Sequence, residues 1–248
     1  MNQNLINIKN VETLVVGPGS VNKLHKELDP LRKKFGLPAL FFFDEFLKED
    51  SNLMSNSAIK EEDLIFYLKT KEEPTTEYVD ELMLEINNKN KTGFSAVIGM
   101  GGGATMDIAK AVGNLLTNKG KAADYQGWDL VKNPAPYKIA IPTLAGTGAE
   151  ATRTCVMTNK STGLKLGMNS DFSVFDEVVL DPDLTATVPK DQYFFSGMDA
   201  FIHCIESLGG NYQHPIGDTY SQNVVQLCKD VFLDQDMMSD ENRSKMMV

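Results

Sequence analysis

Short apolar runs alternate with amphipathic helical stretches through the first three quarters of the chain. Apolar runs bounded by turn residues predict strands over residues 13–16, 39–43, 64–68, 96–99 and 138–141. Helical spacing between the runs predicts helices over residues 20–28, with Ser20 as the cap, and over 76–86. This alternation is typical of a parallel sheet covered by helices. We therefore expect an α/β fold in this part of the chain.

The pattern changes after Asp181-Pro182, where strand-like runs stop and helical spacing continues to the end. Helices are predicted over residues 196–208 and 216–233, and Ser239 is placed to cap a third. We therefore divide the chain into an α/β domain, residues 1–183, and a helical domain, residues 184–248. The last residues lie in an apolar helical run without a C-cap, so we expect the chain to be truncated and the helical domain incomplete.

Composition narrows the class of protein. Of the 248 residues, 42% are apolar and 23% charged, which suits a globular protein. The formal net charge of −10 produces a surface that repels nucleic acid and anionic membranes. Three widely spaced cysteines form neither a disulfide framework nor a zinc-binding spacing. Because the sequence shows no signal peptide and no membrane-spanning run, we expect a cytoplasmic protein without nucleic-acid or membrane partners.

The segment Ala96–Lys110 joins a buried strand to a helix through four glycines in five residues. Glycines allow the backbone to approach a diphosphate closely, and free N–H groups at a helix start attract its charge. The spacing matches neither the usual dinucleotide fingerprint nor a P-loop. Two readings stay open, a phosphate site or a tight strand-to-helix turn in which Asp107 is an ordinary acid of the first helical turn.

A second segment, Ile141–Thr154, delivers hydroxyls and small residues from the carboxyl end of a strand, where open α/β sheets bind ligands. Asp44 also follows a strand, and an acid there accepts hydrogen bonds from an adenosine ribose and repels a 2′-phosphate. Both features are also found in ordinary turns. The sequence therefore indicates a nucleotide site without requiring one.

A third segment, Ser196–Glu206, carries Asp199 and His203 four residues apart, so on a helix both lie on one face and can bind one cation. The alternative is structural. Ser196 would cap the helix, Asp199 would complete a capping-box-like end, and His203 would be a buried histidine with satisfied hydrogen bonds. Spacing alone leaves both readings open.

Taken together, these segments resemble the iron-containing (group III) alcohol dehydrogenase family from about residue 10 to the end. The most specific stretch comprises residues 180–185, Pro189 and Ser196–Glu206. The resemblance implies an N-terminal Rossmann-like dinucleotide-binding domain followed by an all-helical domain, the dehydroquinate-synthase-like architecture. It also implies NAD and a divalent metal, iron or zinc, with Asp199 and His203 as ligands and two further histidines beyond Val248.

The same resemblance assigns the cofactor-binding residues one by one. Asp44 falls on the acid that favours NAD over NADP. Ala104 replaces a common serine, and Glu73 stands where an asparagine is frequent. The diphosphate loop corresponds to Gly102, Gly103 and Asp107, and the remaining cofactor-lining positions to Thr143, Leu144, Thr147, Thr152, Thr154 and Lys165.

Within the family, residues 148–158 and 163–170 look most like the branch of 3-deoxy-manno-octulosonate 8-oxidases. That resemblance implies hydride transfer between the C8 hydroxyl of this acidic sugar and NAD, for lipopolysaccharide modification. Strand alternation sends Arg153 opposite to Thr152 and Thr154, so we expect a cation from elsewhere to bind the sugar carboxylate.

Three other readings stay open. The first is a general alcohol dehydrogenase or aldehyde reductase acting on a small alcohol, and the second is an inactive nucleotide-binding fragment. A lyase of the dehydroquinate-synthase type shares the architecture, but the signature around Asp199 argues against it. In each enzyme reading the partner is a small molecule, and we expect a homodimer.

Overall fold

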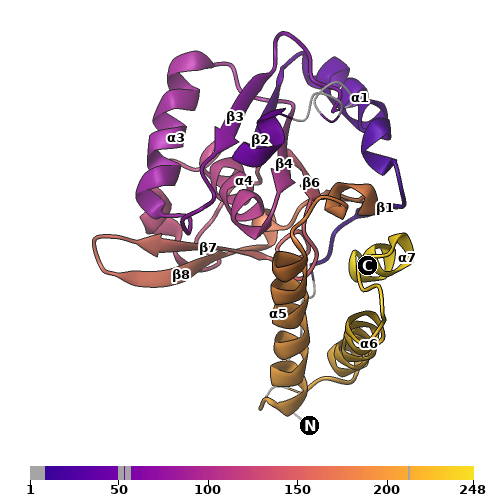
Figure 1. The fold of residues 1–248 in the computed structure, drawn as a ribbon. Helices are drawn as coiled ribbons and strands as arrows, with labels where there is room; N and C mark the ends of the chain where they lie inside the picture. The colour runs from indigo at the N-terminus through magenta and orange to yellow at the C-terminus, as the bar shows by residue number, and fades with distance from the viewer. Residues whose placement is uncertain (1–8, 50–52, 54–56, 212) are drawn as a thin grey trace.

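The computed structural model describes residues 9–49, 53, 57–211 and 213–248. Within these residues the centre of the molecule is a six-stranded parallel sheet (Figure 1). The strands, in their spatial order, are β1 (Thr13–Val16), β9 (Glu177–Leu180), β6 (Tyr137–Pro142), β4 (Ala96–Gly101), β2 (Ala39–Asp44) and β3 (Leu64–Leu68). The five predicted strands are all present, and the α/β prediction is confirmed.

Helices cover both faces of this sheet. They are α1 (His25–Phe35), α3 (Thr76–Lys89) and α4 (Gly103–Leu115). Alternate side chains of β2 point to opposite faces, so Leu40 and Phe42 join the apolar cluster under α3 and α4, while Phe41 and Phe43 join the cluster on the α1 side. Burial on both faces explains why the central strands read as continuous apolar runs.

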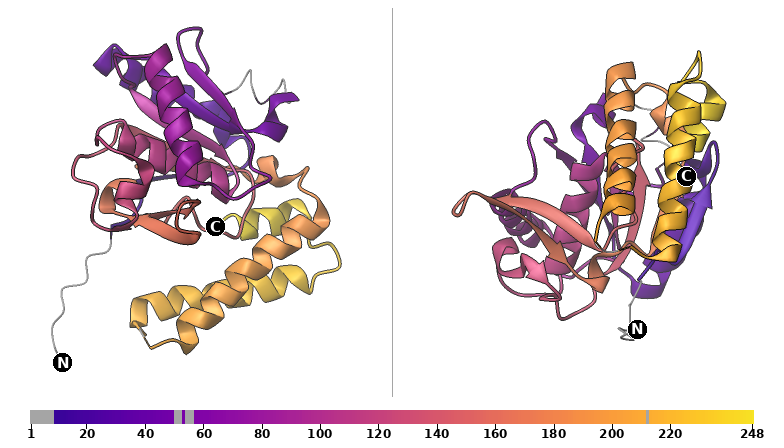
Figure 2. Two further views of the ribbon diagram at one scale, coloured as in Figure 1. Left: turned by 90° about the vertical axis from the view of Figure 1, so that its left-hand side faces the viewer. Right: turned by 90° about the horizontal axis from the view of Figure 1, so that it is seen from below.

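A smaller sheet was not predicted. It consists of β5 (Gly127–Trp128), β8 (Leu164–Asn169) and β7 (Thr154–Asn159), of which β7 and β8 form an antiparallel hairpin. The hairpin projects from the body beside the helical segment (Figure 2). Strand β9 was also missed, although it pairs with both β1 and β6.

After β9 the described chain is helical. A 3-10 turn, η5 (Pro182–Thr185), leads into α5 (Lys190–Gly209), α6 (Pro215–Phe232) and α7 (Asp240–Met246). Helices α5 and α6 lie side by side, and α7 returns to pack against η5 (Figure 2). The switch from strands to helices thus falls after Leu180. The domain division at residue 184 remains a prediction.

Two predicted helix starts are wrong. Helix α5 begins at Lys190 after Pro189, so Ser196 lies inside the helix, where its hydroxyl donates to the carbonyl oxygens of Gln192 and Tyr193. It therefore cannot cap the helix. Residues 20–23 form a 3-10 turn, and the α-helix runs from His25 to Phe35.

The cap of the last helix is confirmed, because the Ser239 hydroxyl accepts from the backbone N–H of Asn242 at the start of α7. The predicted helix over residues 216–233 is also present, as α6.

Asp181 joins the end of the sheet to the start of the chain. Its carboxylate is fully buried and accepts the backbone N–H groups of Gly19, Val21 and Asp183. This single side chain caps η5 and fixes the turn that follows β1. Among the described residues, no helix is long and apolar enough to cross a membrane.

Candidate active-site cleft

The carboxyl ends of the central strands form one edge of a cleft. Chain order reverses there, because β3 lies on one side of β2 and the next strand, β4, on the other. The loops that follow β2 and β4 therefore leave in opposite directions, and this is where open α/β sheets bind ligands. Asp44 ends β2, Gly102 follows β4, and Thr143 follows β6.

Two adjoining hollows, each of about 680 Å³, make up the cleft. The strand-end hollow lies over the ends of the strands, and the start of α5 forms its far wall. It is lined by Asp44, Phe46, Thr70, Gly102, Gly103, Ala104, Thr143, Leu144, Thr147, Thr187, Val188, Pro189 and Gln192.

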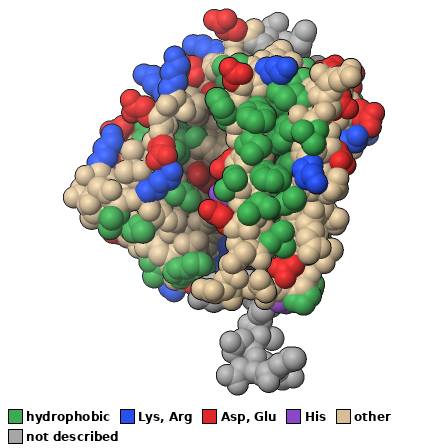
Figure 3. All heavy atoms as spheres, turned by 60° about the horizontal axis from the view of Figure 1, so that its bottom comes forward, with side chains coloured by type: hydrophobic (Ala, Val, Ile, Leu, Met, Phe, Trp, Pro, Cys, Tyr) green, Lys and Arg blue, Asp and Glu red, His purple; other side chains and the backbone are tan. Residues whose placement is uncertain are grey.

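The hairpin hollow lies between the loop after β3, the start of α4, the β7–β8 hairpin and α5. It shares Thr70, Gly103, Ala104 and Thr147 with the strand-end hollow, so the two are continuous. Its other lining residues are Lys71, Glu72, Glu73, Pro74, Asp107, Ala149, Thr152, Thr154, Val156, Lys165, Asp199 and His203. Figure 3 shows a hollow beside a band of hydrophobic side chains over α5 and α6.

The fold brings all the predicted site residues into this cleft. Asp44, Gly102, Thr143 and Leu144 line the strand-end hollow only, and Gly103 and Thr147 line both hollows. The hairpin hollow receives Asp107, Thr152, Thr154, Lys165, Asp199 and His203. Residues up to 159 positions apart in the chain, such as Asp44 and His203, thus face one continuous space.

The glycine loop brings the start of α4 close to its neighbours. Gly101 has φ +158, and a Cβ there would lie 2.5 Å from the Thr105 hydroxyl. A Cβ on Gly103 would lie 3.1 Å from the Thr147 hydroxyl. Gly102, the residue before α4, has no side chain to accept from the first N–H groups of the helix. Because Gly102 and Gly103 line the strand-end hollow, these N–H groups lie at the cleft.

Two charged side chains of α4 lie behind this loop. Burial raises the pKa of Asp107 to about 6, against the opposing effect of Lys110. Burial also lowers the pKa of Lys110 to about 8, although Asp107 acts to raise it. Asp107 therefore loses its negative charge in mildly acidic solution, at the point where an anionic ligand would approach the helix.

Lys110 fixes the chain segment that forms one wall of the hairpin hollow. Its ammonium is fully buried and donates to the carbonyl oxygens of Ala149, Thr152 and Thr154 and to the Thr152 hydroxyl, at 2.5–2.9 Å. Each of these contacts spans about 40 residues of sequence. Sequence reasoning assigned Lys110 no role, because only the folded chain shows its acceptors.

Asp44 accepts a hydrogen bond of 2.6 Å from the Thr70 hydroxyl, which joins the ends of β2 and β3 at the rim of the strand-end hollow. Arg153 lies away from the cleft, where it pairs with Asp129 at 2.5 Å and Asp171 at 3.0 Å. Thr152 and Thr154 line the hairpin hollow and Arg153 does not, as expected, but strand β7 begins only at Thr154, so strand alternation is not the cause.

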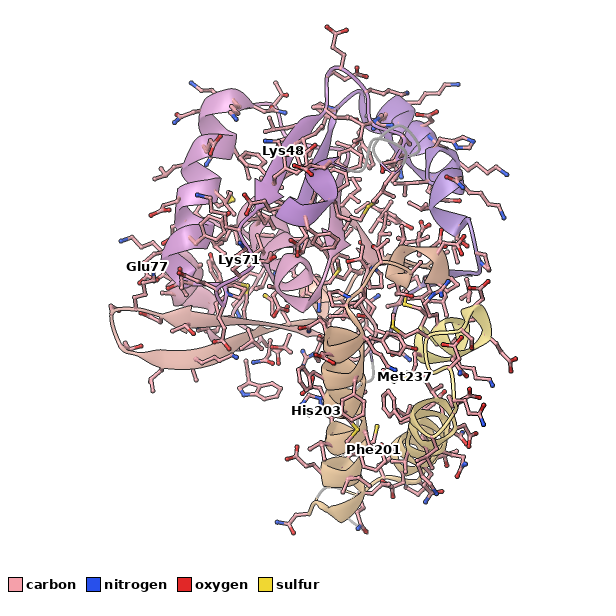
Figure 4. All side chains as sticks on the ribbon, in the orientation of Figure 1. Lys48, Lys71, Glu77, Phe201, His203 and Met237 are labelled. Carbon is pink, nitrogen blue, oxygen red and sulfur yellow. The ribbon has the colours of Figure 1, made fainter. Side chains whose placement is uncertain are left out.

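Asp199 and His203 lie one turn apart on α5, with Oδ1 and Nε2 3.8 Å from each other. Their side chains are 50% and 61% exposed, so the reading of His203 as a buried histidine is wrong. Figure 4 shows His203 on the side of α5 opposite to Phe201, which points toward α6. The pair offers one oxygen and one nitrogen donor to a divalent cation.

These two donors fit half of a metal site. No cluster of three His, Cys, Asp or Glu side chains able to hold a metal occurs in the described part of the chain. Glu206, further along α5, is exposed.

One close approach between the cleft and α5 was also missed. Gly146 lies in the loop after β6 with φ +129, and a Cβ built on it would lie 2.0 Å from the carbonyl oxygen of Ser196. The loop after β6 therefore rests directly on the backbone of α5 at Ser196, three residues before Asp199. A Gly-Thr-Gly sequence signals a turn but not the helix that packs on it.

The structure thus combines a parallel sheet, a cleft at the carboxyl edge of that sheet and a helical segment whose Asp–His pair faces the cleft. The sequence pattern of the iron-containing alcohol dehydrogenases matches residues 12–182. The chain belongs to this family.

Known relatives agree with this assignment. The chain is 38% identical over 135 residues to sulfoacetaldehyde reductase of Bilophila wadsworthia. The matched residues make up 54% of this chain and 35% of the relative. It is 28% identical over 216 residues to NAD-dependent methanol dehydrogenase of Bacillus methanolicus, covering 86% and 55%. The chain thus spans about a third to just over half of these relatives.

Solved structures share the fold. A 1,3-propanediol oxidoreductase superposes with a TM-score of 0.86 at 21% identity, covering 98% of this chain and 64% of the other. Sulfoacetaldehyde reductase from Bifidobacterium kashiwanohense in complex with NAD⁺ superposes with a TM-score of 0.82 at 27% identity, covering 98% and 64%. The dehydroquinate-synthase-like architecture expected from the sequence is confirmed.

Proposed function

We propose that this chain binds NAD in the cleft and forms the cofactor-binding part of a metal-dependent alcohol dehydrogenase or aldehyde reductase. The observation that carries the proposal is that residues assigned separately from the sequence, from Asp44 to His203, line one continuous cleft at the reversal point of the sheet. The family assignment and the relatives named for NAD support it.

In this proposal the start of α4 holds the cofactor diphosphate. The N–H groups that follow Gly102 and the helix dipole attract the phosphate oxygens. Lys165, across the hairpin hollow, supplies a positive charge. Asp107, with its pKa of about 6, repels the diphosphate less in mildly acidic solution. Asp44 at the end of β2 accepts from the adenosine ribose and repels a 2′-phosphate.

Asp199 and His203 would hold iron or zinc. Such a cation, when bound, polarises the substrate oxygen so that its carbon exchanges a hydride with nicotinamide. The part of this chain is to place both donors on one face of α5 and to hold that helix against the loop of Gly146. This contact would hold the two metal donors at a constant position relative to the loop after β6, which lines the cleft.

Small alcohols and aldehydes are the substrate class that we favour. Two relatives are named for sulfoacetaldehyde and methanol. Oxidation of the C8 hydroxyl of 3-deoxy-manno-octulosonate is the narrower hypothesis from the sequence, and we rank it second. An inactive nucleotide-binding fragment is the third reading.

Calorimetric titration of the 248-residue chain with NAD and with NADP tests the cofactor assignment. We expect NAD to bind at least tenfold more tightly, and Asp44→Ala to reduce this preference by weakening NAD and admitting NADP. Equal affinities for the two cofactors in the unmodified chain would refute the role of Asp44. If neither cofactor binds, the proposed function is wrong.

Substrate class is tested on the longest product of the gene, supplied with iron or zinc. NADH oxidation with sulfoacetaldehyde and other short aldehydes is compared with NAD reduction by the eight-carbon sugar acid. Faster turnover of the sugar acid would reverse our ranking. NAD binding with no turnover of any of them would support the nucleotide-binding fragment.

A further inference from the structure

An ion pair connects two walls of the hairpin hollow. Lys165 on β8 donates to Glu73 in the loop after β3, with Nζ and Oε1 2.6 Å apart, and both side chains line the hollow. The residues are 92 positions apart. The other oxygen of Glu73 lies 3.5 Å from the Thr158 hydroxyl on β7.

Backbone contacts hold the same two walls together. The N–H of Thr158 donates to the Pro74 carbonyl oxygen at 2.9 Å, and Thr75 forms a β-bridge with Thr158. The meeting of Glu73 and Lys165 therefore does not depend on the ion pair alone. Figure 4 shows Lys71, from the same loop, above the hairpin.

The charges of the hollow are not suited to an anion while this pair is formed. Two lysines line it, Lys71 and Lys165, and Glu73 neutralises the second. The Lys165 ammonium also lowers the pKa of Glu73, chiefly through their hydrogen bond, so the carboxylate is charged at neutral pH. Glu72, Asp107 and Asp199 add acidic groups.

We propose that Glu73, at the solvent-exposed rim of the hollow, is an intramolecular counter-ion that competes with the anionic diphosphate of the cofactor for Lys165, and so weakens cofactor binding. The inference rests on the proposed function for the identity of the ligand. A diphosphate held at the start of α4 shares the hollow with Lys165, and it has the charge of that lysine to itself only when the Glu73 contact opens. Glu73 thus sets affinity and eases release of the cofactor.

The size of the effect follows from Coulomb's law. A lysine ammonium released from its carboxylate and a phosphate charge about 6 Å away in a water-like medium attract each other enough to change a dissociation constant roughly threefold, and more where the medium is less polar. We expect Glu73→Gln to tighten NAD binding roughly threefold to tenfold. Because Lys165 is then free to contact phosphate, the affinity should also become more sensitive to salt.

The experiment is calorimetric titration of NAD, and separately of inorganic pyrophosphate, at two salt concentrations. Glu72→Gln is the matched control, since Glu72 lines the same hollow and its substitution removes the same charge while leaving the Glu73–Lys165 pair intact. Its effect on affinity should be less than about twofold at ordinary salt. A third variant combines Glu73→Gln with Lys165→Met and is compared with Lys165→Met alone.

Tighter binding in Glu73→Gln, with a smaller effect of Glu72→Gln and the gain abolished when Lys165 is absent, supports the proposal. Weaker binding in Glu73→Gln overturns it, as does an equal gain in both glutamine variants or a gain that persists without Lys165. The pyrophosphate arm separates the two ideas. If NAD does not bind but pyrophosphate binds more tightly to Glu73→Gln, the proposed function fails and the counter-ion assignment stands.

Discussion

Gly146→Ala is expected to disrupt the contact between the loop after β6 and α5. The new Cβ would lie 2.0 Å from the carbonyl oxygen and 2.4 Å from the carbonyl carbon of Ser196, whereas real Cβ contacts are essentially never under 3.0 Å. The loop or the helix must therefore move by about 1 Å. The obstructing atoms belong to helical backbone, so no side-chain rotation relieves the overlap.

The magnitude follows from three contributions. Overpacking of this kind costs about 1–3 kcal/mol. A left-handed backbone costs a residue with a Cβ about 1–2 kcal/mol, and Gly146 has φ +129. Alanine also reduces the conformational entropy of the unfolded chain, which offsets about 0.4–1 kcal/mol of this loss of stability. We expect Gly146→Ala to lower the free energy of unfolding by about 2–4 kcal/mol.

Gly148→Ala is the matched control, because Gly148 has φ +63 and nothing lies within 4 Å of the Cβ that alanine would add. It should lose only about 1 kcal/mol or less. Urea unfolding followed by circular dichroism gives both values, and NAD titration should show a larger loss of affinity in Gly146→Ala. Equal destabilisation by the two substitutions would refute the packing argument.

Three further predictions concern the metal site, a buried acid and a cap. His203→Ala should lower zinc affinity at least tenfold, measured by dye competition. The melting temperature of the metal-free chain should not change, because His203 is 61% exposed. Full zinc binding by the variant would show that His203 is not a ligand. Burial, and to a smaller extent repulsion from Glu27, raises the pKa of Glu177 from 4.5 to about 7. The folded chain therefore binds more protons than the unfolded chain between these pH values, and the free energy of unfolding falls as pH rises from 4.5 to 7. Melting curves recorded across this pH range should show a smaller change for Glu177→Gln. Asp181→Asn should cost about 2–3 kcal/mol in urea unfolding by weakening charged hydrogen bonds, whereas Asp183→Asn, at an exposed position, should cost far less.

Much of the fold could be predicted from the sequence because burial dominates the central strands. Residues 39–43 and 96–99 are buried on both faces, so they appear as apolar runs that no polar alternation interrupts. The hairpin of β7 and β8 was missed for the opposite reason. Strand β8 alternates Leu164, Leu166 and Met168 with polar or small residues, but only Met168 is buried, and the pairing of the strand depends on a partner strand.

The candidate site divides in the same way. The glycines before α4 and the four-residue spacing of Asp199 and His203 are local patterns. The geometry of a turn or a helix is enough to interpret them, so they indicate candidate site residues before the fold is known. The structure then excluded parts of the structural alternative for the third segment, and the ligand roles of Asp199 and His203 stay a prediction. Exposure of His203 excludes a core histidine, and the start of α5 at Lys190 excludes Ser196 as a cap.

What the sequence by itself determined is therefore five of the six strands of the central sheet, the helical character of the last part of the chain, the glycine turn and the spacing of the chemical groups, because each depends on neighbours within a few residues. Only the tertiary structure decided that Lys110 holds the Ala149–Thr154 segment, that Glu73 pairs with Lys165, and that Gly146 rests on α5. These contacts join residues about 40 to 92 positions apart. Such partners are chosen by packing of the sheet and helices, which no local pattern of hydrophobic and polar residues records.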